Sequence, residues 1–276
     1  MKLCSRDALC PKIVPDCLIF DVDGVLVAAG ESFPEMIRIT VEREWARAGF
    51  VADAPGYSTE RNEVLKRHGA FNDDYDIVWV LLNISAAKGR ACLSEALPAP
   101  EELSGIISDC ASDAVEWARR RFAETFERAR IREVCSKVYL GDSEERGTCA
   151  LETSLLSTEW ANWRDLPLPA YIYTGRNLRE WRLARELLGW SDFPDERVVH
   201  SDSGMQKPSA SGLSHLCDHF GHSSPLFIGD TASDLQAYLA FGAGWFAAVG
   251  GLLPDVALRF SDVNEALNEL IGWMRG

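Results

Sequence analysis

The chain lacks the features that mark a membrane-spanning or exported protein. Its apolar runs stay short of the roughly 20 residues that a membrane helix needs. The segment from Met1 to Asp7 contains no apolar stretch of the kind found in a signal peptide. We therefore expect a cytoplasmic protein that does not cross a membrane.

Basic residues are in the minority. Lys and Arg total 28 against 42 Asp and Glu, which gives a formal net charge of -14. Such a charge repels nucleic-acid backbones and anionic membrane surfaces, so neither is expected as a partner. Small anionic substrates stay open, because a few donors or a bound divalent cation can reverse the potential inside one pocket.

The cysteines show no closely spaced pairs. None of the eight forms a Cys-x-x-Cys motif, and they lie at positions 4, 10, 17, 92, 110, 135, 149 and 217. This scatter predicts buried or free thiols rather than a disulfide framework or a zinc site. Repeats and low-complexity tracts are also missing, so a chain of 276 residues with 47% hydrophobic content predicts one or two globular domains.

Short apolar runs alternate with helical periodicity in the second half of the chain. After a first run at 18–20, further runs lie at 170–173, 197–200, 225–228 and 245–249, and helical segments at 178–188, 213–220, 235–239 and 263–274. This alternation predicts an α/β fold in which a Rossmann-like parallel sheet has helices on both faces.

The pattern between Val27 and about Asp165 is helical, with no convincing buried strand. Helices are predicted at 32–49, at 58–69, at 72–89 with Asn72 as N-cap, and as one long helix over 109–132. We therefore expect an α/β core domain made of residues 1–28 and 153–276, with an all-helical domain, 29–152, inserted after the first strand.

Polar clusters follow four of the predicted strands. They are Asp21-Val22-Asp23-Gly24, Thr174-Gly175-Arg176, the loop containing Lys207, and Gly229-Asp230-Thr231-Ala232-Ser233-Asp234. Taken singly, each fits an ordinary turn, a helix N-cap or a surface lysine. Because parallel strands place their carboxyl ends at one edge of the sheet, the four together favour a single ligand site.

In these four motifs the sequence resembles the haloacid dehalogenase superfamily, in particular its subfamily I with a helical cap after the first strand (subfamily IA-like, C1 cap). The resemblance spans essentially the whole chain. It implies that Asp21 is the nucleophile and Asp23 the general acid and base. It further implies that Thr174 and Lys207 bind phosphate, and that Asp230 and Asp234 form the Mg²⁺ site.

The chemistry of the residues agrees with these roles. A carboxylate that attacks a phosphate monoester needs a cation to offset repulsion, and Mg²⁺ prefers oxygen ligands. Asp21, the Asp23 carbonyl and Asp230 can supply these oxygens, and Asp234 can hold a metal-bound water. Gly24, Gly175 and Arg176 join Thr174 and Lys207 as expected phosphate-binding residues, because backbone N–H groups and cations hold phosphate oxygens. We therefore expect a Mg²⁺-dependent phosphatase that hydrolyses a small phosphorylated metabolite through an aspartyl-phosphate.

Other functions remain open at this point. A phosphomutase of the β-phosphoglucomutase type shares all four motifs. A 2-haloacid dehalogenase attacks carbon and lacks the second Asp of the first motif, whereas Asp23 is present here. A non-catalytic regulatory module with this fold is the remaining alternative, and the intact motifs count against it.

The segment between two inserted helices, residues 69–76, is the expected site of substrate recognition. Asn72 or Asp73 is expected to contact the leaving group, and an acidic surface there favours a leaving group that carries a hydroxyl or an amine. An N-cap and favourable interactions with the helix dipole explain the same residues without a substrate.

Overall fold

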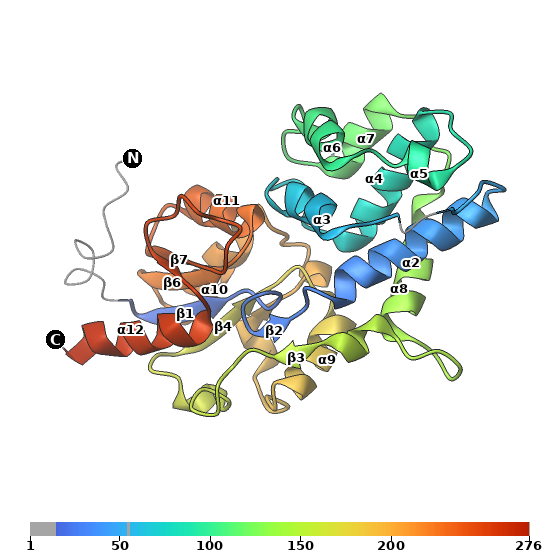
Figure 1. Cartoon of the computed structure of the whole chain (residues 1–276). Helices are drawn as coiled ribbons and strands as arrows, with labels where there is room; N and C mark the ends of the chain where they lie inside the picture. Colours follow the sequence, from blue (N-terminus) through green and yellow to red (C-terminus); the bar gives the residue numbers. More distant parts are fainter. Residues whose placement is uncertain (1–14, 54–55, 276) are drawn as a thin grey trace. The chain divides into compact units, whose positions relative to one another are not determined.

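The computed structural model describes residues 15–53 and 56–275, and Figure 1 shows their arrangement. The chain forms two compact units: unit 1 contains the residues up to Ala28 and those from Thr153 onward, and unit 2 is Ala29–Glu152. The expected α/β architecture with a helical insertion is confirmed. None of the helices in the described ranges is long and apolar enough to cross a membrane.

Unit 1 is built on a six-stranded sheet in the order β5-β4-β1-β6-β7-β8. All neighbouring strands are parallel, and β1 pairs with β4 through Phe20 and Ile172 and with β6 through Phe20 and Ile228. The strands are β1 (Cys17–Phe20), β4 (Ala170–Tyr173), β5 (Val198–Val199), β6 (Pro225–Gly229), β7 (Trp245–Val249) and β8 (Arg259–Phe260). Five of the six were predicted; β8 was missed because it has only two residues.

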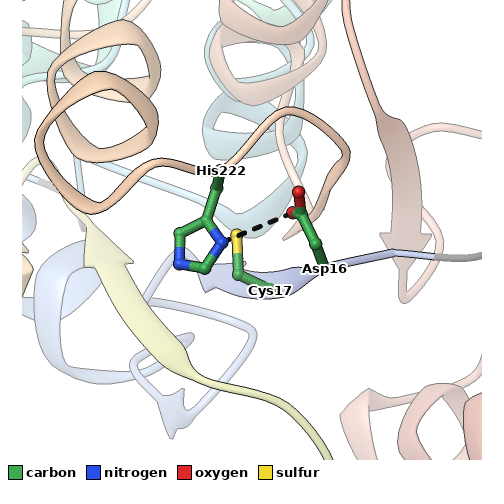
Figure 2. A group of neighbouring side chains, drawn as sticks. All are labelled: Asp16, Cys17 and His222. Carbon is green, nitrogen blue, oxygen red and sulfur yellow. Dashed lines mark ion pairs between the residues drawn. The ribbon is translucent and has the colours of Figure 1, made fainter.

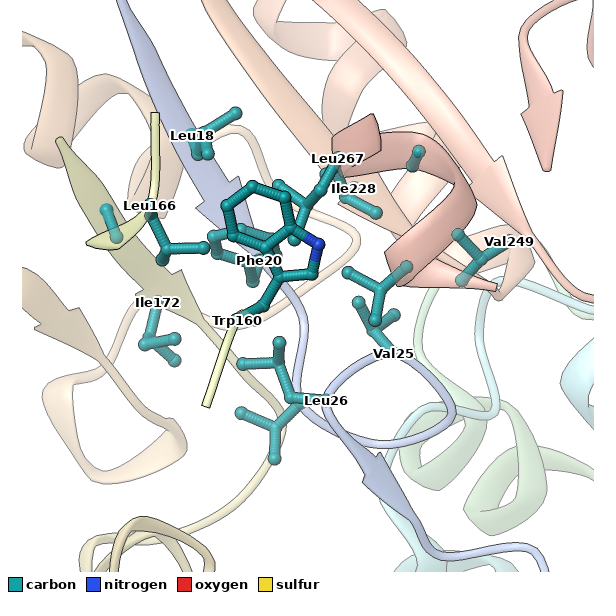
Figure 3. Close-up of a cluster of buried hydrophobic side chains, with 14 of the residues drawn as sticks. Leu18, Phe20, Val25, Leu26, Trp160, Leu166, Ile172, Ile228, Val249 and Leu267 are labelled. Atoms are coloured by element: carbon teal, nitrogen blue, oxygen red, sulfur yellow. The ribbon is translucent and has the colours of Figure 1, made fainter. Parts of the chain in front are cut away.

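Helices cover both faces of this sheet. They are α9 (Leu178–Leu187), α10 (Ser211–Phe220), α11 (Ala232–Phe241) and α12 (Val263–Arg275), with short 3-10 turns η3 (Trp163–Asp165), η4 (Asp195–Arg197) and η5 (Ser201–Ser203). Successive residues of a strand point to opposite faces, so Leu18 and Phe20 pack with α9 and α12, while Cys17 and Ile19 pack with α10 and α11. Figure 3 shows the first of these two clusters, which includes Trp160 and Phe20.

A pair of two-residue strands marks where the chain leaves and re-enters unit 1. Strand β2 (Val27–Ala28) pairs antiparallel with β3 (Thr153–Ser154), with Ala28 opposite Thr153. Both strands were unpredicted, because two residues carry too little periodicity to recognise. The pairing holds the two ends of unit 2 side by side.

Unit 2 is helical and organised around one apolar helix. Its helices are α2 (Ser32–Arg47), α3 (Thr59–Lys66), α4 (Asp74–Ala87), α5 (Leu93–Ala96), α6 (Pro100–Ile107), α7 (Ala114–Arg121) and α8 (Arg128–Leu140), followed by the 3-10 turn η2 (Thr148–Leu151). Helix α4 is buried over most of its circumference and contacts α2, α7 and α8. Such a helix is expected at the centre of a bundle.

The single long helix expected over 109–132 is wrong. The chain forms α7 and α8 instead, and residues 122–127 between them are not helical. Asn83 of α4 explains the break: its Oδ1 accepts from the backbone N–H groups of Thr125 (2.7 Å) and Phe126 (3.2 Å). The indole N–H of Trp79 donates to the carbonyl of Phe126 at 2.7 Å. These contacts satisfy backbone groups that would otherwise need helical partners.

The expected N-cap of the third inserted helix is also off by one residue. Asp73, not Asn72, caps α4, and its side chain accepts from the backbone N–H groups of Tyr75 and Asp76.

The cysteines of the described ranges form no disulfide framework, as expected. Six cysteines are free there: Cys17, Cys92, Cys110, Cys135, Cys149 and Cys217. Cys4, Cys10 and the N-terminal segment judged for a signal peptide lie outside the described residues.

Candidate active site

The loop that leaves β1 brings Asp21 to the carboxyl edge of the sheet. The Asp21 N–H donates to the carbonyl of Ile228 in β6 at 2.9 Å, and its side chain is buried. Gly24 has φ +72°, and a Cβ built there would lie 2.2 Å from Oδ2 of Asp230. Only glycine therefore allows this loop to turn and to pass so close to the carboxylate of Asp230.

Lys207 joins two of the four motifs. Its Nζ lies 2.7 Å from Oδ1 of Asp21 and 2.7 Å from Oδ1 of Asp234, and all three side chains are nearly inaccessible to solvent. Burial alone lowers the pKa of the ammonium group, but the two carboxylates outweigh burial and hold the pKa of Lys207 above its usual range. The lysine is therefore a permanent cation inside the site.

Asp21 has an unusual environment for a carboxyl group. Burial raises its pKa most, repulsion from Asp234 and Asp23 adds to this, and Lys207 lowers it, with the result that the pKa of Asp21 is raised to about 7. Strongly shifted carboxyl groups in a polar cluster are typical of functional sites. A divalent cation beside Asp21 would favour its ionised form.

The start of α11 fixes Asp234. Its Oδ2 accepts from the backbone N–H of Thr231 at 3.0 Å and from the Thr231 hydroxyl at 2.7 Å. A Cβ at Gly229 would lie 2.5 Å from Cβ of Asp234, so glycine at the end of β6 lets the helix start close to the strand. Thr231 was not predicted as a site residue, although a Thr three residues before an Asp is a recognisable capping pattern.

Three carboxylates converge at this edge. Oxygen atoms of Asp21, Asp230 and Asp234 lie within 4.8 Å of one another. An all-oxygen set of anionic ligands suits a hard divalent cation, and Gly24 leaves room beside it, so these residues fit a metal ion. The side chain of Asp23 is not in this cluster.

Asp23 instead pairs with Arg176 from the loop after β4. Nε and Nη2 of Arg176 donate to Oδ1 of Asp23 at 3.0 and 2.6 Å, and Nη1 donates to the carbonyl of Glu180 at 3.3 Å. The guanidinium is fully buried, whereas the side chain of Asp23 is 32% exposed. Sequence reasoning placed Arg176 among the phosphate-binding residues and missed this pair, which joins residues 153 positions apart.

Thr174 and Gly175 complete the loop after β4. The Thr174 N–H donates to the carbonyl of Val199 at 3.0 Å, and its Oγ1 accepts from the N–H of Arg176 at 3.1 Å. Thr174 is buried. Because β4 is the neighbour of β1, this loop and the Asp21 loop leave adjacent strands at the same edge.

Residues 15–242 match the model of the haloacid dehalogenase-like hydrolase family. The match covers most of the chain and includes all four motifs. The chain belongs to this family.

The chain is also similar in fold to solved structures. A phosphatase, Tt82 from Thermococcus thioreducens, has a TM-score of 0.64 and 26% identity, over 93% of this chain and 99% of that chain. A predicted phosphoglycolate phosphatase from Haemophilus somnus has a TM-score of 0.57 and 15% identity, over 92% of this chain and 96% of that chain. A haloacid dehalogenase superfamily hydrolase of subfamily IA from Geobacter sulfurreducens has a TM-score of 0.51 and 15% identity, over 92% of this chain and 99% of that chain. No curated protein matches the chain.

In this haloacid dehalogenase-like hydrolase the acidic residues at the N-cap and in the first turn of α4 are paired with basic ones. Oδ2 of Asp73 accepts from Nη1 of Arg132 at 2.9 Å, and the carboxylate of Asp76 contacts both Arg128 and Arg132. Oδ1 of Asp74 lies 2.8 Å from Nζ of Lys66. The acidic surface expected in this segment is thus offset by cations from α3 and α8. Asn72 precedes the capping residue.

Proposed function

We propose that this hydrolase is a Mg²⁺-dependent phosphatase that acts on a small phosphate monoester through an aspartyl-phosphate. The observation that carries the proposal is the cluster in which Lys207 contacts Asp21 and Asp234 at the edge where Asp230 also lies. One buried cation among three carboxylates leaves excess negative charge, which a divalent cation would neutralise before a phosphate enters.

Asp21, Asp230 and Asp234 would hold the metal ion, together with the backbone carbonyl of Asp23. When bound, Mg²⁺ would offset the repulsion between a carboxylate and a phosphate dianion and stabilise charge that develops on the phosphate oxygens. Lys207 keeps Oδ1 of Asp21 in a fixed position, so the nucleophile is oriented before substrate binds.

Asp21 is proposed to attack phosphorus in line. A bond forms between its carboxylate oxygen and phosphorus while the bond from phosphorus to the ester oxygen breaks. Asp23 donates its proton to that departing oxygen and then accepts one from the water that hydrolyses the acyl phosphate. Arg176 binds Oδ1 of Asp23 through two N–H groups, which leaves Oδ2 as the oxygen we expect to carry the proton.

Thr174, Gly175 and Lys207 are proposed to bind the transferring phosphoryl group, with Gly24 allowing close approach of its loop. A hydroxyl, backbone N–H groups at the start of a helix and an ammonium group stabilise equatorial oxygens as charge develops on them. Arg176 is proposed to act there mainly through Asp23, because its guanidinium is already engaged with that carboxylate.

Substrate choice is assigned to unit 2, which we propose is a cap domain, while unit 1 is the catalytic domain. Asn72 and Asp73 remain the proposed contacts of the leaving group. The pairing of Asp73, Asp74 and Asp76 with basic side chains removes the argument that an acidic surface in this segment favours a leaving group with a hydroxyl or an amine. The substrate class is therefore kept as a small phosphorylated metabolite.

The test is release of inorganic phosphate from a panel of sugar phosphates, phosphoglycolate, nucleotides and p-nitrophenyl phosphate, with Mg²⁺ and with EDTA. We expect turnover only with Mg²⁺, and loss of nearly all of it in Asp21→Asn, whose folding is verified by circular dichroism. Full activity in EDTA, or in Asp21→Asn, would reject the proposal. Transfer of the phosphoryl group between sugar positions without release would instead identify a mutase, and halide release from a 2-haloacid would identify a dehalogenase.

A further inference from the structure

A second group of metal-ligating side chains lies at the opposite, amino edge of the sheet. Asp16 and Cys17 stand at the start of β1, and His222 follows the end of α10 (Figure 2). One oxygen, one sulfur and one nitrogen atom of these residues lie within 4.8 Å of one another. Cys17 and Asp21 are four positions apart at the two ends of β1, a distance of about 13 Å along an extended strand, so this group is distinct from the candidate active site.

The side chains of Asp16 and His222 face each other across this group. Oδ1 of Asp16 and Nδ1 of His222 are 3.6 Å apart, and Figure 2 shows them pointing toward each other beside the sulfur of Cys17. A tetrahedral zinc ion with bonds of about 2.0–2.3 Å holds its ligand atoms roughly 3.5 Å apart. The spacing of these two atoms thus fits one shared ion and is long for a direct hydrogen bond.

The remaining atoms of Asp16 and His222 are fixed by other partners. Oδ2 of Asp16 accepts from the backbone N–H groups of Ser223 (2.7 Å) and Ser224 (3.0 Å). Oδ1 is buried and receives no hydrogen bond from a nitrogen or hydroxyl donor in the described ranges. Nε2 of His222 lies 2.7 Å from the hydroxyl of Tyr171. A metal-binding histidine usually donates its second N–H to an oxygen in this way, which directs the other nitrogen to the metal.

We propose that Asp16, Cys17 and His222 bind a transition-metal ion of the zinc type. The mixed sulfur, nitrogen and oxygen donors select zinc, cobalt or a related ion over Mg²⁺, which prefers oxygen alone. Cys17 binds as a thiolate, and its proton passes to solvent when the metal enters. The ion would tie the start of β1 to the end of α10, so its expected contribution is to the stability of unit 1 rather than to catalysis.

Titration of the reduced, full-length protein with Co²⁺ tests this site. We expect one equivalent of Co²⁺ to produce a sulfur-to-cobalt charge-transfer absorption, which Zn²⁺ then abolishes by displacement. Cys17→Ser should remove the absorption, and His222→Gln should weaken Co²⁺ binding at least tenfold. Zn²⁺ should raise the melting temperature of the wild type and leave that of His222→Gln unchanged.

Matched controls separate this site from other donors in the chain. Cys217→Ser removes the thiol in hydrogen-bond contact with Cys17 and should keep the absorption, as should a Cys4→Ser/Cys10→Ser double variant. Asp230→Asn, in the candidate active site, should also keep it. If Cys17→Ser does not fold, Asp16→Asn and His222→Gln replace partly exposed side chains and carry the test. Absence of the absorption in the wild type, or its survival in Cys17→Ser, would overturn the proposal.

Discussion

At the scale of single residues, the most informative contact is the one between Arg176 and Asp23. The guanidinium is fully buried and gives two hydrogen bonds to one carboxylate oxygen. Lysine cannot reproduce this forked geometry, because its ammonium group is a point charge on a flexible stem. Arg176 therefore acts as a positioning residue in the proposed reaction.

We expect Arg176→Lys to lower kcat for an alkyl phosphate at least about tenfold more than kcat for p-nitrophenyl phosphate. The alkoxide needs a proton from Asp23 to leave, whereas p-nitrophenolate leaves without one. Steady-state kinetics on both substrates gives the ratio of kcat for the alkyl phosphate to kcat for p-nitrophenyl phosphate. A loss of folded enzyme lowers both values equally, so an unchanged ratio would argue against this role. Arg179→Lys, at an exposed position nearby, is the matched control.

Gly24 offers a second test at this scale. Its φ of +72° and a Cβ position 2.2 Å from Oδ2 of Asp230 forbid a larger residue. In Gly24→Ala, backbone strain of about 1–2 kcal/mol adds to displacement of the Asp230 carboxylate. We expect the Mg²⁺ concentration for half-maximal activity to rise at least about tenfold, measured by Mg²⁺ titration of phosphate release.

The matched control is Gly30→Ala, because a Cβ at Gly30 meets nothing within 4 Å. That variant should titrate like the wild type. An unchanged Mg²⁺ requirement in Gly24→Ala would show that Asp230 does not need its present position.

At the scale of elements, helix α4 determines the conformation of unit 2. Its side chains bind the backbone where α7 ends and α8 begins, through Asn83 and Trp79. Its first turn is capped by Asp73, which also contacts Arg132 of α8. The ends of three helices are thus fixed by side chains of one central helix and its cap.

Asp73→Ala should lower the free energy of unfolding by about 1 kcal/mol, since an N-cap is lost. Thermal denaturation measures this loss. Asp113→Ala, which removes the cap of α7, provides the comparison for a cap without the Arg132 contact.

Asp73→Ala also tests substrate recognition. A selective rise in KM for the best natural substrate supports a contact with the leaving group, and equal effects on that substrate and on p-nitrophenyl phosphate reject it.

At the scale of the whole molecule, the chain divides into its two units at the paired strands β2 and β3. Both hydrophobic clusters of unit 1 contain residues of unit 1 alone. The paired residues Ala28 and Thr153 bring the chain ends of unit 2 together. Unit 1 consequently has a complete core and continuous strand pairing without the inserted residues.

We expect a variant in which Asn-Gly replaces residues 29–152 to fold as an α/β domain, because this dipeptide favours a two-residue hairpin turn. It should retain Mg²⁺-dependent hydrolysis of p-nitrophenyl phosphate and lose its preference among natural phosphates. Circular dichroism, thermal unfolding and the substrate panel check this. An unfolded product would show that unit 1 depends on unit 2, and a retained preference would place substrate selection in unit 1.

The sequence by itself determined five of the six strands of the parallel sheet, the order of the motifs and the helical nature of the insertion. Apolar runs and helical periodicity are local, and Asp21, Thr174, Lys207 and Asp230 each follow a strand directly or within one loop. A parallel sheet then places them at one edge without further information.

Only the tertiary structure decided the contacts that give these residues their environments. Arg176 pairs with Asp23, and Lys207 contacts two carboxylates. Asn83 binds the backbone at the break between α7 and α8, and His222 lies beside Asp16 and Cys17. All of these contacts join residues far apart in the chain. Local patterns do not encode which distant side chain satisfies a buried charge or a backbone N–H. That choice depends on the packing of the complete fold.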